Sequence, residues 1–223
     1  MQRMIQHLYM VPLFISMFLS FKSFRMKWPP PYRTFSILLI TISGTELLAY
    51  LWKFFFFNLR NWPYSQSNLW LYNSFLIPQY LGYMAVYYQA LESVRIKKTI
   101  IGLAIAYAVL GLLNNFFLQG IHNVDSYTVV MAGSIVIFMT VAWFNQTLRG
   151  KELIRLQSHP MTWISLGALI FHAAELPYIL SLNYLVRINI PLALALFYIY
   201  LSLNCIMYTA YIIAFLCQTP PRS

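Results

Sequence analysis

The segment FSILLITISGTELLAYLWKFFFF (residues 35–57) contains only two charged side chains, Glu46 and Lys53. A helix that crosses a membrane needs about 20 mostly apolar residues, so this segment predicts a membrane span. Glu46 lies near its middle, where an ionisable side chain costs roughly 2.5–3.5 kcal/mol to insert and usually faces a bundle interior or a water-filled cavity. The same segment therefore indicates both a fold and a candidate site residue.

Six other segments have a similar apolar character. The chain has 223 residues, of which 60% are hydrophobic and 9% are charged, and this composition is typical of a polytopic membrane protein rather than a soluble domain. The predicted spans are residues 8–21, 35–57, 69–91, 99–118, 128–147, 161–182 and 191–217. Between the first two, Pro29-Pro30-Pro31 should stop a helix and stiffen the turn. We expect an all-α protein with one transmembrane domain, residues 1–223.

The basic residues are distributed unevenly between the two sides of this domain. Eleven are on the side of the C-terminus: Lys22, Arg25, Lys27, Arg33, Arg95, Lys97, Lys98, Arg149, Lys151, Arg155 and Arg222. Four are on the other side: Arg3, Lys53, Arg60 and Arg187. The positive-inside rule then places the N-terminus outside and the C-terminus in the cytoplasm, in a plasma or inner membrane. The net charge of +10 is thus explained by topology. The expected partner is the lipid bilayer and not a nucleic acid.

Two parts of the chain resemble each other. GTELLAYL (44–51) and AAELPYIL (173–180) align with a shift of 129 residues, which superposes Glu46 on Glu175. A shift of 125 residues pairs the third span with the seventh, as Tyr72/Phe197, Phe75/Tyr200, Gln79/Asn204 and Tyr83/Tyr208. Such matches predict two parallel three-helix units, 4–91 and 128–217, joined by the helix 99–118 in a 3+1+3 arrangement.

Seven spans with an external N-terminus resemble the broad group of seven-helix transporters, opsins and G-protein-coupled receptors. Opsins carry a retinal-binding Lys in the last span, and no Lys occurs in residues 184–223. The resemblance therefore implies no retinal, and no cofactor is expected. The stretch WPYSQSNLWLYNSFLIPQYLGYMAVYYQAL (62–91) is similar to small uncharacterised seven-span membrane proteins of Bacteroidota, a likeness that implies no activity.

Polar side chains of several spans are expected at the same depth. His172 and Glu175 are one helical turn apart, and Pro177 frees a backbone carbonyl beside them. Sites for substrates and coupling ions in secondary transporters lie near the membrane midplane. The predicted central site consists of Glu46, Gln79, Tyr83, His172, Glu175, Asn204 and Tyr208. If only one acid is functional, Glu175 is favoured because it has His172 and Pro177 beside it.

The leading functional hypothesis is a small-molecule or ion transporter, with proton coupling through a Glu as one form of it. The alternatives are a ligand sensor that signals through a separate partner protein and an accessory membrane subunit. An enzyme is not expected, because the chain has no HExxH or GxSxG motif. His172, Glu175 and Glu46 make only a weak set of metal ligands, and a structural reading of His172 and Glu175 is a hydrogen-bonded pair that fixes helix packing.

Overall fold

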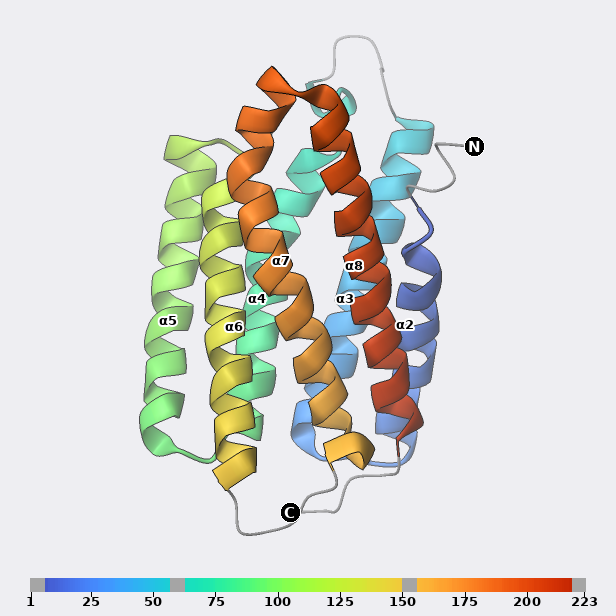
Figure 1. Cartoon of the computed structure of the whole chain (residues 1–223), viewed down its shortest axis with the longest axis vertical. Coiled ribbons are helices and arrows are strands. Elements are labelled where there is room, and N and C mark those ends of the chain that lie inside the picture. Colours follow the sequence, from blue (N-terminus) through green and yellow to red (C-terminus); the bar gives the residue numbers. More distant parts are fainter. Residues whose placement is uncertain (1–6, 57–62, 150–155, 218–223) are drawn as a thin grey trace.

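The computed structural model is a bundle of long helices (Figure 1) and describes residues 7–56, 63–149 and 156–217. Several residues on which the charge interpretation depends lie outside these ranges: Arg3, Arg60, Lys151, Arg155 and Arg222. The ends of the predicted second span (Phe57) and of the predicted first repeat unit (Met4) lie outside them as well.

The described residues form seven α-helices. They are α2 (Met10–Arg25), α3 (Pro30–Phe55), α4 (Leu69–Ala90), α5 (Val94–Leu113), α6 (Ser126–Arg149), α7 (Pro160–Ile188) and α8 (Ile190–Leu216). A π-helical turn, Asn114–Leu118, extends α5, and short 3₁₀ turns cover Pro63–Ser65 and Leu156–Ser158. Each predicted span overlaps one of these helices, and the predicted all-α class is confirmed.

Five helical segments in the described ranges are long and apolar enough to cross a membrane: Pro30–Phe55, Val94–Leu118, Ser126–Arg149, Pro160–Leu182 and Ile190–Leu216. The protein is therefore an integral membrane protein. Helices α2 and α4 do not meet the same criteria, so the total of seven spans stays a prediction. Helix α2 has only 16 residues, and its Ser16, Ser20 and Ser23 are buried. These serines lower its hydropathy but face the protein interior.

Helix α3 begins at Pro30, five residues before the predicted span. Pro30 and Pro31 occupy its first turn, where the backbone N–H that proline lacks would have no partner within the helix and where the fixed φ of proline suits the helix. The prediction that these two prolines belong to the connecting turn was therefore wrong. Pro29, with φ −51° and ψ 154°, is the extended residue at which the turn ends.

Six of the helices pack into a closed ring. Each of α2, α3, α4, α6, α7 and α8 packs against the next in that order, and α8 packs back against α2. Helix α5 lies outside the ring against α4 and α6, at one edge of the bundle in Figure 1. We call the end where α2 and α4 begin the upper end and the opposite end the lower end, as they lie in Figure 1.

The order of helices in the ring is unchanged by a half-turn about an axis along the bundle. Such a rotation exchanges α2 with α6, α3 with α7 and α4 with α8. Within each exchanged pair the two helices run in the same direction, since α2, α4, α6 and α8 descend and α3 and α7 ascend (Figure 1). A parallel repeat would produce this arrangement.

Aromatic side chains fill the interior of the ring toward its lower end. We call this the aromatic layer, and it consists of Trp28, Phe35, Tyr83, Tyr211 and Phe215, each at most 2% exposed. Phe35 contacts the rings of Tyr83, Tyr211 and Phe215 at centroid distances of 6.3, 4.9 and 6.1 Å. The hydroxyl groups of Tyr83 and Tyr211 are hydrogen-bonded at 3.0 Å. The layer therefore connects α3, α4 and α8.

The closest approach of α7 and α8 depends on Gly167. A Cβ atom at this position would lie 3.0 Å from the Cβ of Ala210 and 3.2 Å from the backbone oxygen of Met207. Small residues at helix interfaces allow this close approach in membrane proteins. We expect Gly167→Ala to destabilise the protein by about 1–3 kcal/mol, because the two backbones must separate. Thermal unfolding of the purified protein in detergent measures the change.

Gly102 supplies a matched control for this substitution. A Cβ atom at Gly102 would meet nothing within 4 Å, and Ala is favoured over Gly inside a helix by about 1 kcal/mol. Gly102→Ala should therefore leave the melting temperature unchanged or raise it. An equal decrease in both variants would show that the α7–α8 approach does not contribute to stability as described.

Candidate ligand site in a central cavity

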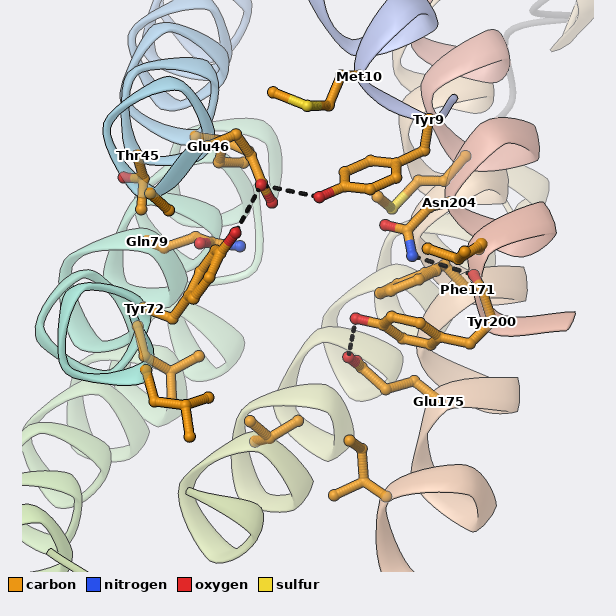
Figure 2. Close-up of a pocket in the computed structure, with 18 of the residues that line it drawn as sticks. Tyr9, Met10, Thr45, Glu46, Tyr72, Gln79, Phe171, Glu175, Tyr200 and Asn204 are labelled. Atoms are coloured by element: carbon orange, nitrogen blue, oxygen red, sulfur yellow. Dashed lines mark hydrogen bonds between the residues drawn. The ribbon is translucent and has the colours of Figure 1, made fainter. Parts of the chain in front are cut away.

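The ring of helices encloses a cavity of about 510 Å³ above the aromatic layer, within the 300–1,000 Å³ typical of small-molecule sites. All seven residues of the predicted central site line it: Glu46, Gln79, Tyr83, His172, Glu175, Asn204 and Tyr208. Figure 2 shows Glu46 and Tyr72 on one side of the cavity and Glu175, Tyr200 and Asn204 on the other. Side chains that are up to 162 positions apart in the chain thus surround one space.

Glu46 is held by two phenol groups. The hydroxyl of Tyr9, which precedes α2, donates to Glu46 Oε2 at 2.8 Å, and the hydroxyl of Tyr72 on α4 donates to the same oxygen at 2.9 Å (Figure 2). Both distances are normal for a hydrogen bond between oxygens. Among the described residues no Lys, Arg or His forms an ion pair with Glu46. The ion pair found among them joins His172 and Glu175.

Glu175 has a different environment from Glu46. His172 Nδ1 and Glu175 Oε2 are 2.7 Å apart, and the two side chains are 2% and 6% exposed. The hydroxyl of Tyr200 on α8 lies 3.5 Å from the other oxygen, Glu175 Oε1, a long and weak hydrogen bond (Figure 2). The two acids therefore match in position but differ in partners, because Glu175 has an imidazole where Glu46 has a second phenol.

The second nitrogen of His172, Nε2, is buried and has no hydrogen-bond partner among the described residues. Since Nδ1 bonds Glu175, Nε2 is a free acceptor if the ring is neutral and a free donor if the ring is protonated. The rings of Tyr80 and Tyr83 pack beside the imidazole, with centroids 5.5 and 5.9 Å away. An unpaired buried nitrogen costs free energy, so this position favours the binding of a water molecule, a proton or a polar ligand group.

The amide residues of the site have separate roles. Asn204 Nδ2 donates to the backbone oxygen of Tyr200 at 3.0 Å. This bond fixes the Asn204 amide one helical turn from Tyr200, whose hydroxyl contacts Glu175. Gln79 lines the cavity on the same side as Glu46 and Tyr72 (Figure 2). Polar groups that are few and oriented, on an otherwise apolar wall, are typical of ligand sites.

The upper part of the cavity is lined by His7, Tyr50, Lys53 and Asn68. The ring of His7 packs edge-on against Tyr50 at a centroid distance of 5.2 Å. Burial and the charge of nearby Lys53 lower the pKa of His7 below its ordinary value. His7 is therefore uncharged at neutral pH, which leaves Lys53 as the cation among the described residues that line this part of the cavity. Lys53 is seven positions from Glu46, about 10 Å along the helix, and the described ion pairs do not include the two.

Tyr9 and Asp125 are among the residues of the cavity wall that were not predicted from the sequence. Tyr9 lies before α2, and nothing in the sequence connects it with Glu46. Asp125 is 2% exposed, lines the cavity and precedes α6, where Oδ1 accepts the backbone N–H of Thr128 at 3.2 Å. Asn114 of the π-helical turn also donates to this oxygen. An Asp just before an apolar helix is a sign of an N-cap and could have identified Asp125.

A metal centre is not formed by the acids and histidines of the site. Within the described residues no three His, Cys, Asp or Glu side chains are grouped so that they could hold a metal ion. The weak set of His172, Glu175 and Glu46 is therefore not such a group. The described cysteines, Cys205 and Cys217, are free thiols on α8 and at its end.

The fold and the cavity together define an all-α integral membrane protein with an internal polar site. No protein-family model matches the chain, and no curated protein or solved structure shows significant similarity to it. Its function is therefore argued from the cavity itself.

Proposed function

We propose that the protein is a proton-coupled transporter of small molecules, with seven spans, an external N-terminus and a cytoplasmic C-terminus. The observation that carries the proposal is the central cavity, which contains two membrane-embedded acids and ends at a closed aromatic layer. Ionisable residues at this depth mark substrate and ion pathways. The location between two three-helix units is the one used by secondary transporters.

Alternating access requires a barrier on one side of the site that can open. Between the cavity and the lower end, the aromatic layer is that barrier, and the bond between Tyr83 and Tyr211 joins α4 to α8 within it. Rotation of the two three-helix units relative to each other would separate these hydroxyls and open the cavity downward. The upper part of the cavity would close in the same movement.

The contacts also support the internal repeat, in a different register from the predicted one. If Glu46 corresponds to Glu175, then the phenols that bind them, Tyr72 and Tyr200, correspond as well and are 128 positions apart. Tyr83 and Tyr211 are also 128 positions apart and bond each other, as two equivalent residues on a two-fold axis do. We therefore propose a shift of 128 residues for α4 and α8, about one helical turn from the predicted 125.

The pair formed by His172 and Glu175 is the proposed site of proton coupling. In this proposal the pair takes up and releases one proton, and among the described residues His172 Nε2 has no hydrogen-bond partner that would fix its protonation state. One proton would bind the pair when the substrate leaves the cavity, and it would be released to the side on which the cavity is open when substrate binds. Glu46, bound by two phenols, would contact the substrate.

The charge distribution supports the proposed orientation. Described basic residues near the lower end are Lys22, Arg25, Lys27, Arg33, Arg95, Lys97, Lys98 and Arg149, and those near the upper end are Lys53 and Arg187. The positive-inside rule then places the lower end in the cytoplasm.

Alternating access can be tested without knowledge of the substrate. Gln79→Cys is introduced into a protein in which both native thiols are removed (Cys205→Ser and Cys217→Ser). Because Gln79 lines the cavity, a transporter should expose this thiol to a membrane-impermeant methanethiosulfonate reagent from either side of oriented vesicles. Labelling is read by mass spectrometry after the reagent is applied to one side at a time.

Two exposed positions calibrate the sidedness of labelling. Tyr127→Cys at the start of α6 should react only from the outside, and Val94→Cys at the start of α5 only from the cytoplasmic side, because these residues are 64% and 65% exposed at opposite ends. If Gln79→Cys reacts from one side alone while both controls behave as expected, the protein does not alternate. That result would favour a ligand sensor over a transporter.

A further inference from the structure

We propose that the cavity binds a small organic cation with an aromatic or apolar body, held by Glu46 and by the surrounding rings. This inference rests on the proposed function of the same site and names its substrate class. It is carried by the charge of the cavity, the chemistry of its wall and its size.

The charge argument begins with the partners of each acid. Glu175 Oε2 lies 2.7 Å from His172 Nδ1, whereas Glu46 has only the hydroxyls of Tyr9 and Tyr72 among the described residues. Two phenol donors on one oxygen suit a carboxylate, which accepts hydrogen bonds and does not donate them. An acid in the membrane interior stays ionised only if a cation lies close to it, and otherwise it takes up a proton. Among the described residues that ion-pair partner is absent, so a bound cation would supply it.

The wall around Glu46 is suited to organic cations in particular. Six aromatic residues line the same cavity: Tyr72, Tyr80, Phe171, Phe197, Tyr200 and Tyr208. Aromatic rings attract ammonium groups through the negative charge of their faces, and they also bind apolar or aromatic parts of a ligand by contact. An inorganic ion would use neither property, and would need convergent oxygen ligands for which a cavity of about 510 Å³ is too large.

The positive side chains of the cavity do not favour an anion. His172 is already paired, and His7 is uncharged at neutral pH, which leaves Lys53. Lys53 lies on α3 seven positions from Glu46, about 10 Å along the helix toward the upper end. An anion at Lys53 would be outside the part of the cavity that both acids line. A cation near Glu46 would be surrounded by rings and by the amide of Gln79.

Phenyltrimethylammonium and benzenesulfonate provide a direct test, because they share a phenyl ring and carry opposite permanent charges. Binding of each to the purified protein in lipid nanodiscs is measured by isothermal titration calorimetry, with benzyl alcohol as the neutral probe. The protein should prefer phenyltrimethylammonium to both other probes. Glu46→Gln should weaken its binding by about 30-fold or more, because a buried charge partner is lost.

Glu92→Gln is the matched control for this substitution. Glu92 is exposed in the turn between α4 and α5 and does not line the cavity, so the same chemical change there should leave binding unchanged. Glu46→Asp keeps the charge and should restore most of the affinity. If Glu46→Gln does not fold, the proposal is tested by whether the unaltered protein prefers phenyltrimethylammonium to benzenesulfonate and benzyl alcohol. Equal binding of the three probes, a preference for benzenesulfonate, or no binding at all would overturn the proposal.

The two proposals can fail separately. Binding of phenyltrimethylammonium to Glu46 is measured without a gradient, whereas labelling of Gln79→Cys from both sides reports alternation without a substrate. Two-sided labelling with no preference for the cation would refute the proposed substrate class but not the proposed transport function. One-sided labelling with strong, Glu46-dependent binding would refute transport and favour a sensor of organic cations.

Discussion

Replacing His172 with Leu is expected to destabilise the protein by about 3–5 kcal/mol, the largest single effect that the structure predicts on stability. The substitution removes the imidazole that lies 2.7 Å from Glu175 and leaves a carboxylate that is 6% exposed without its ion-pair partner. The weak bond from Tyr200 at 3.5 Å cannot replace it. Reversible unfolding in mixed detergent micelles, followed by circular dichroism, measures the change.

The double variant His172→Leu with Glu175→Met is the control for this prediction. Replacing both members of a buried ion pair by apolar residues of similar volume is often neutral or stabilising, because no unpaired charge remains. We therefore expect the double variant to recover most of the stability while it loses proton coupling. Equal destabilisation of the single and double variants would show that His172 acts through packing against Tyr80 and Tyr83 and not through its pairing with Glu175.

Glu175→Gln is expected to abolish uptake driven by a pH gradient in proteoliposomes while it preserves exchange of substrate across the membrane. The amide keeps the shape of the carboxyl group but cannot take part in the proton transfer proposed for the pair with His172. Uptake of radiolabelled phenyltrimethylammonium is measured with and without the gradient. The accumulation ratio of the variant should fall to one.

Glu46→Gln should lose both gradient-driven uptake and exchange, because Glu46 is the proposed anchor of the cation. The two acids thus have distinguishable roles although they occupy corresponding positions. Full gradient-driven accumulation by the double variant Glu46→Gln with Glu175→Gln would exclude proton coupling through either acid. Glu92→Gln should behave as the unaltered protein in every assay.

Much of the architecture was predictable from hydropathy alone. All seven predicted spans overlap helices, because each must satisfy its backbone hydrogen bonds internally in a membrane. Five are confirmed as long and apolar enough to cross it. The start of α3 was misplaced because Pro30 and Pro31 were read only as helix breakers, whereas proline is favoured in the first turn.

The composition of the candidate site was predictable, but the partners of its residues were not. The polar side chains that were expected at one depth do line one cavity, because helices of similar length place their centres at the same level. The bond from Tyr9 to Glu46 depends on how the chain before α2 folds over the cavity. A span pattern contains no information on that contact.

The relative importance of the two acids also changed with the structure. Glu175 was favoured by its neighbours His172 and Pro177. The same proximity gives Glu175 a partner within the protein, since His172 Nδ1 lies 2.7 Å from its Oε2. Glu46 binds two phenols, and among the described residues it has no ion-pair partner. For substrate binding, Glu46 is now the favoured acid, and Glu175 is proposed to bind the proton.

The register of the repeat shows a similar limit. Sequence matching paired Tyr83 with Tyr208, because residue type alone determines the score of a shift. The register proposed from the contacts instead pairs Tyr83 with Tyr211, to which it is hydrogen-bonded at 3.0 Å. Several tyrosines one turn apart on each helix make such neighbouring registers difficult to distinguish without the three-dimensional contacts.

The most direct test of transport through this cavity is counterflow of radiolabelled phenyltrimethylammonium. Proteoliposomes are loaded with the unlabelled cation, diluted into buffer that contains a trace of labelled cation, and compared with protein-free liposomes. This measurement requires no proton gradient, and the permanent charge of the probe prevents passive entry. We predict transient accumulation of label by the unaltered protein and by Glu92→Gln, and none by Glu46→Gln. Label that stays at the level of protein-free liposomes, although the purified protein binds the cation, would contradict transport.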